Sequence, residues 1–352
     1  MPVRAQLRDW SRDAQDKSGA KRGRKRRSLE VALCFAPLLC WVGAWTAPTC
    51  RHLALAMAAS TLGPRFTIRS ISGVVRGGAS PVAWRVVEAT RAGAWRPHWE
   101  ALFGSFQGSV PADWTVLVLA DRGWYARWLC TTIPALGWHP CLRLNRQGRS
   151  RVPASATLRP LPQGVSRVGQ RWAGQVIGFA TPARQRACTL LARWDAGYRA
   201  PWLILTALPP TAVDVAWYGW RAWIECGFKD SKRGGGHGEQ TKMLAPARAE
   251  RLWLALAVAT FGTVSGGCQA EVEPPRPQLT QLPEPQIARQ RATGQRPARS
   301  LSGFRRGRLV ILAALCLGQP LPVGDILPEL WPSSHETALD RLRAYPPLPK
   351  VA

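Results

Sequence analysis

Residues 218–232 read YGWRAWIECGFKDSK, and this stretch says most about the fold and chemistry of the chain. Tyr218, Arg221, Glu225 and Lys232 stand at offsets 0, 3, 7 and 14. At about 100° per helical residue they fall within an arc of roughly 60°. One helical face would then carry a phenol, a guanidinium, a carboxylate and an ammonium group, and the glycines at 234–236 predict the helix end. A lone carboxylate among cationic donors suits a metal-bound phosphate better than an ordinary helix surface.

A simpler interpretation is a solvated helix held by a salt bridge. Glu225 can pair with Arg221 at i,i−4, and such pairs are common and weak. Three neighbouring tryptophans, at 217, 220 and 223, argue against it, because they indicate a helix packed on several sides. A charged cluster in such surroundings needs a specific reason.

Composition and charge narrow the class of protein. The 352 residues suffice for one large domain with insertions or for two to three smaller ones, and the 46% hydrophobic residues allow a substantial core. Lysine and arginine number 48 against 21 acids, a formal charge of +27. This excess favours a polyanionic partner, nucleic acid first, bound in a steeply salt-dependent way. An anionic membrane surface is the alternative.

Cysteines and short motifs exclude several chemistries. The nine cysteines form no C-x-x-C pair and no zinc-type spacing with histidine, which fits reduced thiols in a cytoplasmic protein. Walker, G-x-S-x-G and H-E-x-x-H motifs are missing from the sequence. Residues 31–47 superficially resemble a signal peptide or a membrane span. The stretch is short, contains Pro37 and follows a basic run, so we predict a buried helix.

Five regions follow from the pattern along the chain: a basic helical N-terminal region (1–50), a first core part (51–145), a β-rich insertion (146–200), a second core part (201–265), and a Pro/Arg-rich linker with a helical tail (266–352). Short apolar runs predict strands at 53–60, 65–75, 81–87, 114–120, 141–145, 171–179, 187–194 and 201–208. Helices are predicted at 124–136, 246–261 and 308–318. The N-terminal region is an arm for phosphate contacts or a solubilising tail; its basic cluster is Lys21, Arg22, Arg24, Lys25, Arg26 and Arg27.

The order of these elements resembles the RNase H-like architecture, an α/β fold with a mixed sheet flanked by helices. Strands come first, then a strand ending in Asp121, then a mostly β insertion, and then the helix that carries Glu225. In that architecture, acids from different elements lie side by side and share two divalent ions.

The spacing Y-x2-R-x3-E-x6-K resembles the signature of the insertion sequence 4 family of DDE transposases. VLVLADRGWYARWL around Asp121 is similar to the family's second-acid region. RFTIRSISGVVRGGASPVAW and PARAERLWLALAVATF also resemble family sequence, so the likeness covers about residues 30–265. It implies magnesium-dependent phosphodiester cleavage and strand transfer, with double-stranded DNA (transposon ends and target) as partner. It also implies self-association on DNA and a place near the bacterial nucleoid, without a membrane.

Carried over by position, Asp121 is the second acid and Glu225 the third, and both would bind magnesium. Arg221 and Lys232 would contact phosphates near the cut, and Tyr218 would brace the same strand. Taken alone, an Asp before glycine at a strand-to-helix turn is usually an N-cap. We therefore expect Asp121 and Glu225 to lie near enough to bind the same ions.

The first acid is missing. Its position on the opening strand, LALAMAASTLG, is Ala58, and the sequence has no acid between Glu30 and Glu88. Arg69 and Gly73 also stand where the pattern calls for apolar side chains. We therefore predict that this chain is a degenerate copy of such a transposase, with an incomplete two-magnesium site and impaired cleavage. The alternatives are a non-catalytic DNA-binding remnant and a basic protein associated with RNA or ribosomes.

Overall fold

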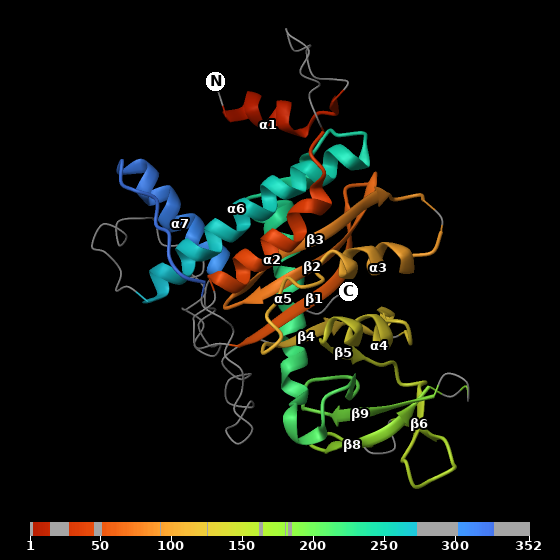
Figure 1. Ribbon diagram of the computed structural model, residues 1–352. Coiled ribbons are helices and arrows are strands. Elements are labelled where there is room, and N and C mark those ends of the chain that lie inside the picture. Colours follow the sequence, from red (N-terminus) through yellow and green to blue (C-terminus); the bar gives the residue numbers. More distant parts are fainter. Residues whose placement is uncertain are drawn as a thin grey trace.

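A mixed sheet with helices on both faces forms the centre of the computed structural model (Figure 1). Its ten strands follow the order β3-β2-β1-β4-β5-β10-β9-β8-β6-β7 in the part of the chain that the structure describes. Strands β1, β4 and β5 run parallel to one another, and the other neighbours pair antiparallel. The strands are β1 (His52–Leu62), β2 (Phe66–Val75), β3 (Gly78–Glu88), β4 (Thr115–Ala120), β5 (His139–Arg143), β6 (Arg149–Arg151), β7 (Arg159–Pro160), β8 (Arg171–Gly178), β9 (Arg186–Arg193) and β10 (Trp202–Thr206).

The described residues are 3–14, 28–45, 51–91, 93–124, 126–161, 165–179, 181, 185–272 and 302–326. The predicted basic cluster at 21–27 and most of the Pro/Arg-rich linker lie outside them. The α-helices are α1 (Val3–Ser11), α2 (Phe35–Ala44), α3 (Arg96–Gly104), α4 (Leu129–Thr132), α5 (Ala222–Lys229), α6 (Pro246–Val272) and α7 (Gly303–Cys316). Tighter or wider turns are η2 (Val31–Cys34), η3 (Arg122–Trp124), η4 (Pro134–Leu136), η7 (Pro210–Ala212), η8 (Val215–Arg221), η9 (Asp230–Gly234) and η10 (Gly238–Gln240).

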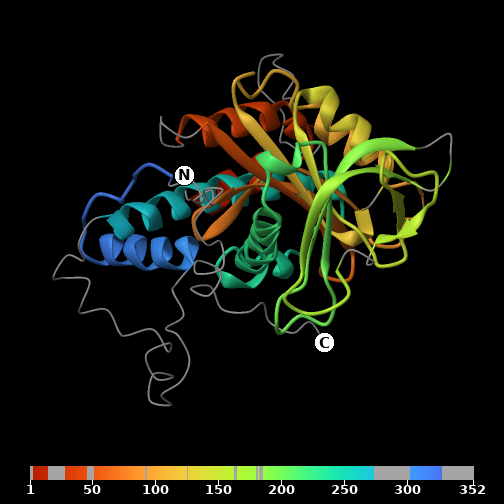
Figure 2. The same cartoon turned by 90° about the horizontal axis from the view of Figure 1, so that it is seen from below.

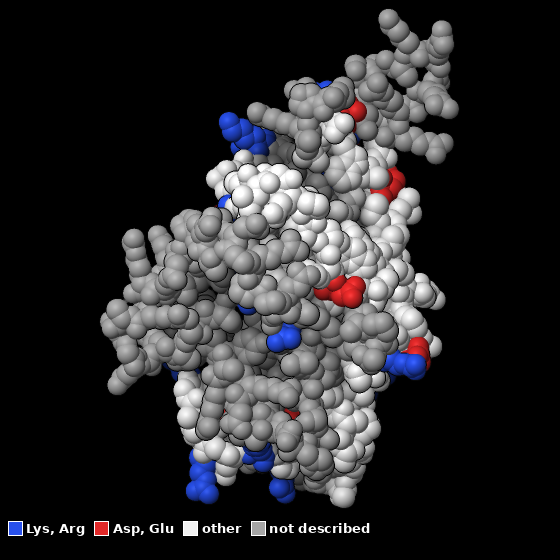
Figure 3. Space-filling model, turned by 90° about the vertical axis from the view of Figure 1, so that its left-hand side faces the viewer, with Lys and Arg blue, Asp and Glu red and all other residues white. Residues whose placement is uncertain are grey.

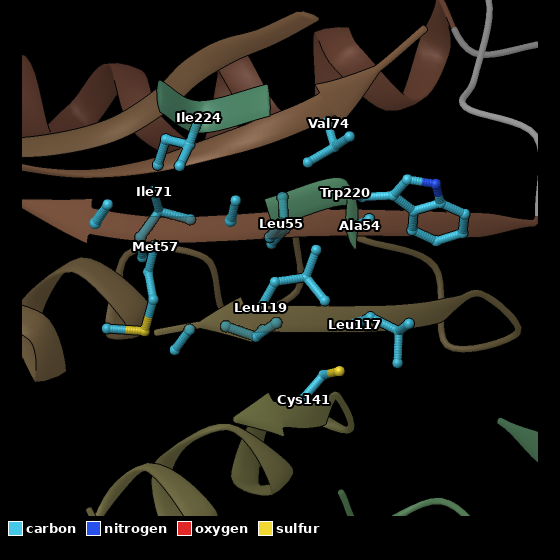
Figure 4. Packing of buried hydrophobic residues seen from close by; sticks show 14 of the residues in the cluster. Ala54, Leu55, Met57, Ile71, Val74, Leu117, Leu119, Cys141, Trp220 and Ile224 are labelled. Atoms are coloured by element: carbon cyan, nitrogen blue, oxygen red, sulfur yellow. The ribbon is translucent and has the colours of Figure 1, made fainter. Parts of the chain in front are cut away.

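The core lies where apolar strands are covered on both faces. β4, the run TVLVLA, is buried from its second residue onward, as predicted for a central strand. Figure 4 shows Leu55 and Met57 on β1 and Leu117 and Leu119 on the neighbouring strand β4, all in the buried core. All four side chains are fully buried, so the centre of the sheet is closely packed.

Helices α2 and α5 pack on opposite faces of the sheet, which Figure 2 shows from below. A Cβ on Gly73 of β2 would lie 3.4 Å from Val42 of α2. The next residue, Val74, pairs with Ala79 of β3, whose backbone contacts α5. Because neighbouring residues of a strand face opposite sides, α2 and α5 cover different faces.

Close packing of α5 on the sheet depends on Gly227. A Cβ at this position would lie 2.6 Å from the carbonyl oxygen of Ala79. We expect Gly227→Ala to force α5 away from β3 and to lower the free energy of unfolding by about 1–3 kcal/mol. Urea unfolding measures the change. The matched control is Gly262→Ala in α6, where the added Cβ meets nothing within 4 Å and should be neutral or stabilising. Equal effects of both substitutions would contradict the packing argument.

Helix α6 is the longest element and packs along the edge strand β3. Glu250 accepts a hydrogen bond from the Val86 amide at 2.8 Å, and Trp84 Nε1 donates to the Glu250 carbonyl at 3.1 Å. By length and composition its residues 246–270 could cross a membrane, but 56% of the apolar window is buried. That burial is typical of a packed helix in a soluble α/β protein. The predicted buried helix within 31–47 is confirmed: η2 and α2 bury Val31, Phe35, Leu38, Leu39 and Val42.

Some predicted elements differ from the structure. The strands predicted at 171–179, 187–194 and 201–208 are present as β8, β9 and β10, and they extend the core sheet through the β5–β10 pair. The helix predicted at 124–136 is wrong: only the four residues of α4 are α-helical, and the tighter turns η3 and η4 lie before and after it. Pro134, which has no backbone N–H, begins η4, and Gly137 in the left-handed region ends it. Helix α3 lacked a recognised sequence signal, and α6 continues eleven residues past its predicted end at 261.

Candidate functional site

The carboxyl ends of two parallel strands define the site. The last register pair of β1 and β4 joins Met57 to Ala120. One residue further, Ala58 and Asp121 therefore continue the two strands side by side. Ligands of α/β proteins commonly bind at such carboxyl ends. Ala58, where the family resemblance would place the first acid, is 2% exposed, so a buried methyl group lies at this position beside Asp121.

The predicted signature helix is a continuous helical segment with three kinds of winding. It runs through the 3₁₀ turn η8, the α-helix α5 and the π-helical turn η9, and it ends before Gly235, whose φ is 155°. Asp214 caps its start by accepting from the Ala216 amide at 2.7 Å. Uniform α-helical spacing therefore does not hold along the whole segment. Wide π-type turns are frequent at functional sites.

Two signature residues, Tyr218 and Arg221, contact Asp121, and Arg221 also contacts Glu225. The Tyr218 hydroxyl donates to Asp121 Oδ1 at 3.4 Å. Arg221 Nη2 lies 3.7 Å from Asp121 Oδ2 and 3.0 Å from Glu225 Oε1. Because one nitrogen contacts both carboxylates, their oxygens cannot be farther apart than these two distances together. Asp121 and Glu225, about a hundred residues apart in sequence, thus share one guanidinium.

Lys232 reaches the same end of the sheet from the π-helical turn. Its Nζ donates to Ser60 Oγ at 2.6 Å, and Ser60 shares a strand face with Ala58, two residues earlier. Burial lowers the pKa of Lys232, while Glu239 and Glu225 act in the opposite direction. Ser60 was not among the predicted site residues. The sequence could have identified Ser60, because residues two apart in a strand point to the same face and Ser60 is two residues after Ala58.

The structure also contains the local contacts that the simpler interpretations predict for Asp121 and Glu225, a turn cap and an i,i+4 salt bridge. Asp121 Oδ1 accepts from the Arg122 amide at 2.7 Å, as a turn-capping Asp does. Glu225 pairs with Arg221 at i,i+4, and the Glu225 side chain is 57% exposed, so this pair alone contributes little stability. The contacts of Arg221 and Tyr218 with Asp121 go beyond local pairing, because they join the second half of the core to the first.

Aromatic packing holds Tyr218 in place. It is 4% exposed, and burial raises the pKa of its hydroxyl, which therefore stays protonated and can donate at neutral pH. Its ring meets Trp202 edge-on at 5.3 Å, and the guanidinium of Arg143 lies 5.9 Å from both rings. Trp217 and Trp220 stack at 6.3 Å on the same turn. The tryptophans that suggested a packed helix are partly or fully buried, as expected.

Asp230, directly after α5, is a buried acid that the sequence argument did not single out. It is 5% exposed, and burial raises its pKa to about 6, while Arg305 of α7 and Lys229 act against the rise. A carboxyl whose folded pKa exceeds its unfolded value stabilises the fold at low pH. That contribution is lost as the pH rises from about 4 to 6.

We expect Asp230→Asn to remove this pH dependence. At pH 8 the variant should be more stable than the unaltered chain by up to about 3 kcal/mol, and near pH 4 the difference should vanish. Urea unfolding across this pH range measures the difference. The control is Asp113→Asn at an exposed position. If the free energies of unfolding of the Asp230 variant and the unaltered chain differ by the same amount at every pH, Asp230 is not a buried group that binds a proton in this range.

The donor set does not fit two magnesium ions. Magnesium prefers oxygen ligands, and Asp121 and Glu225 offer carboxylates at one place. In two-metal sites the ions lie about 3.5–4 Å apart and share ligands. Here Ala58 supplies no oxygen, and Arg221 already contacts both remaining carboxylates. Two carboxylates that already pair with one arginine do not supply the ligands that two magnesium ions need.

The insertion is almost free of negative charge. Between Asp121 and Asp214 the sequence has one acid, Asp195, and Arg193 already pairs with it at 2.7 Å. The side of the molecule seen in Figure 3 shows basic side chains protruding at its lower end. The described arginines from β5 to β10 are Arg143, Arg146, Arg149, Arg151, Arg159, Arg167, Arg171, Arg186, Arg193 and Arg199. Such a surface attracts a polyanion.

Comparison with protein-family models and with curated proteins finds no match for this chain. The site is therefore interpreted from its own residues. Asp121, Tyr218, Arg221 and Glu225 lie together, and Lys232 contacts the adjacent strand end. His237 has a left-handed backbone conformation directly before η10. The predicted DNA-contacting residues Lys21, Arg22, Arg24, Lys25, Arg26 and Arg27 lie outside the described residues.

Proposed function

We propose that this chain is a transposase-type DNA-binding protein of the insertion sequence 4 kind, with an RNase H-like core, and that its DNA cleavage is severely impaired. The observation that carries the proposal is the register of β1 and β4, which ends at Met57 and Ala120 and so brings Ala58 next to Asp121. Tyr218 and Arg221 contact Asp121 at the same place. The element order supports it: strands, then Asp121 after a buried strand, then a β-rich insertion, then Glu225 on a helix.

The chemistry of the site explains binding without efficient cleavage. In-line phosphodiester hydrolysis needs an activated water and a stabilised leaving oxygen, and two metal ions commonly supply both. Arg221 and Lys232 are cationic donors suited to a phosphate, and Tyr218 holds Asp121. Without an acid at position 58, one carboxylate that the reaction needs is missing. Losses of single catalytic groups commonly cost about 3 kcal/mol or more of transition-state stabilisation.

The partner in this proposal is double-stranded DNA, at the ends of the element and at its target, and the protein self-associates when bound there. The chain would act in a bacterial cytoplasm, at the nucleoid. The closest alternative is a remnant that only occupies element ends. The buried methyl group at position 58 favours that remnant over a fully active enzyme.

A binding and cleavage assay tests the proposed function. The purified protein is incubated with an element-end duplex, a random duplex and a structured RNA, with Mg²⁺ or Mn²⁺ present. We expect preferential binding of the end duplex and no nicking above background. Robust metal-dependent nicking by the unaltered chain would refute the impairment. Preference for RNA over both duplexes would refute transposase-type binding.

A further inference from the structure

Arg69 of β2 is a buried guanidinium without a counter-ion in the part of the chain that the structure describes. It is 3% exposed, and its Nε and Nη1 atoms are buried without a hydrogen-bond partner among the described residues. The ring of Trp95, just before α3, covers the guanidinium at 3.5 Å. A cation–π contact offsets only part of the cost of removing a charge from water.

Further positive groups surround Arg69. Arg85 is its register partner on β3, and Arg91 follows that strand. His98 of α3 has its pKa lowered by burial and then by Arg69, Arg85 and Arg91 in turn. Glu250 of α6 pairs with Arg85 at 3.4 Å, and no ion pair of Arg69 occurs among the described residues. The cluster of Arg69, Arg85, Arg91 and His98 therefore has an excess of positive charge.

This cationic cluster lies on the sheet face opposite the signature site. Ala58 pairs with Ser70, and Arg69 is the neighbour of Ser70 on the same strand, so Arg69 points to the other face. The cluster consequently cannot assist chemistry at Asp121. Burial lowers the pKa of Arg69 to about 10, so its charge persists at neutral pH.

We propose that the cationic cluster is a second anion-binding site, in which Arg69 binds a phosphate group. A phosphate accepts several hydrogen bonds in the fork geometry that a guanidinium offers, and Arg85 and Arg91 add charge beside it. Trp95 is 42% exposed, and its ring covers the guanidinium from the solvent side. Rotation of this side chain admits the anion. The same phosphate chemistry occurs in a nucleic-acid backbone and in free phosphate.

Thermal unfolding with inorganic phosphate tests the site. We expect phosphate to raise the Tm of the unaltered chain by at least about 2 °C over chloride at equal ionic strength. Arg69→Met should show a higher Tm without phosphate, because a buried unpaired charge is removed, and no phosphate-dependent rise. Arg69→Lys, which keeps the charge, should retain a weakened rise. The control is Arg51→Met, which removes an exposed arginine paired with Asp113 and should leave the rise intact.

A duplex-binding arm separates the two sources of phosphate. If the site takes a DNA phosphate, Arg69→Met lowers duplex affinity, and the slope of log K against log salt falls by about one. If the phosphate rise is lost but duplex binding is unchanged, the ligand is a free or small-molecule phosphate. No phosphate-specific rise in the unaltered chain, or an undiminished rise in Arg69→Met, would overturn the proposal. Neither result depends on cleavage or on end-specific binding.

Discussion

We expect Ala58→Asp to raise the rate of metal-dependent nicking of an element-end duplex by at least about 100-fold. The substitution places a third carboxylate on β1, beside Asp121 and on the strand face that Lys232 reaches through Ser60. Glu225 and Asp121 already lie around one guanidinium, so a third acid completes a group of three at this end of the sheet. Gel analysis of nicked product over time measures the rate.

Two controls make this experiment decisive. Ala58→Asn has nearly the same shape without the charge and should remain inactive. Ala58→Asp combined with Glu225→Gln should lose the gain. Ala58 is buried, so urea unfolding of each variant is measured beside activity. A folded Ala58→Asp protein that binds the end duplex but nicks no faster would mean that the site has decayed at further positions.

DNA affinity should fall by about 10³–10⁵ between 50 and 200 mM salt, if the duplex contacts six to ten phosphates. The physical reason is counterion release by arginines and lysines, which exceed the acids by 27 in this chain. Fluorescence anisotropy with end and random duplexes at several salt concentrations measures the slope.

The insertion offers a site-directed version of the salt experiment. Arg171 and Arg186 lie exposed on β8 and β9, in the nearly acid-free part of the chain. Replacing both by glutamine should reduce the slope by about two if each contacts a phosphate. The matched control replaces Arg51 and Arg96, which already pair with Asp113 and Glu100. A slope near zero for the unaltered chain would argue against nucleic acid as the partner.

The strands of the core were predictable because their signals are local. Apolar runs such as TVLVLA can be recognised without knowing their neighbours, and β4 is central as expected. The signature helix was predictable for the same reason, including its end at the glycines. Local signals failed at 124–136, where apolar residues suggested one helix but only α4 is α-helical and Pro134 begins the tighter turn η4.

Contacts between distant segments were harder to predict from sequence. The shared position of Asp121 and Glu225 was expected only through the family resemblance, because spacing within one helix does not indicate what faces it. The bond of Lys232 to Ser60, the burial of Asp230 and the stacking of Trp95 on Arg69 all depend on how β1, α7 and α3 pack. The prediction that the signature residues share one face also assumed an α-helix throughout, whereas the segment begins as a 3₁₀ helix and ends as a π-helix.

The position of Arg221 bears on how the fold tolerates two neighbouring carboxylates. Two negative groups held in one corner of a fold repel each other, and a protein that relied on divalent ions to offset this would weaken once the ions no longer bound. Here an internal cation already balances that corner. The protein's own side chains therefore hold these two carboxylates in place.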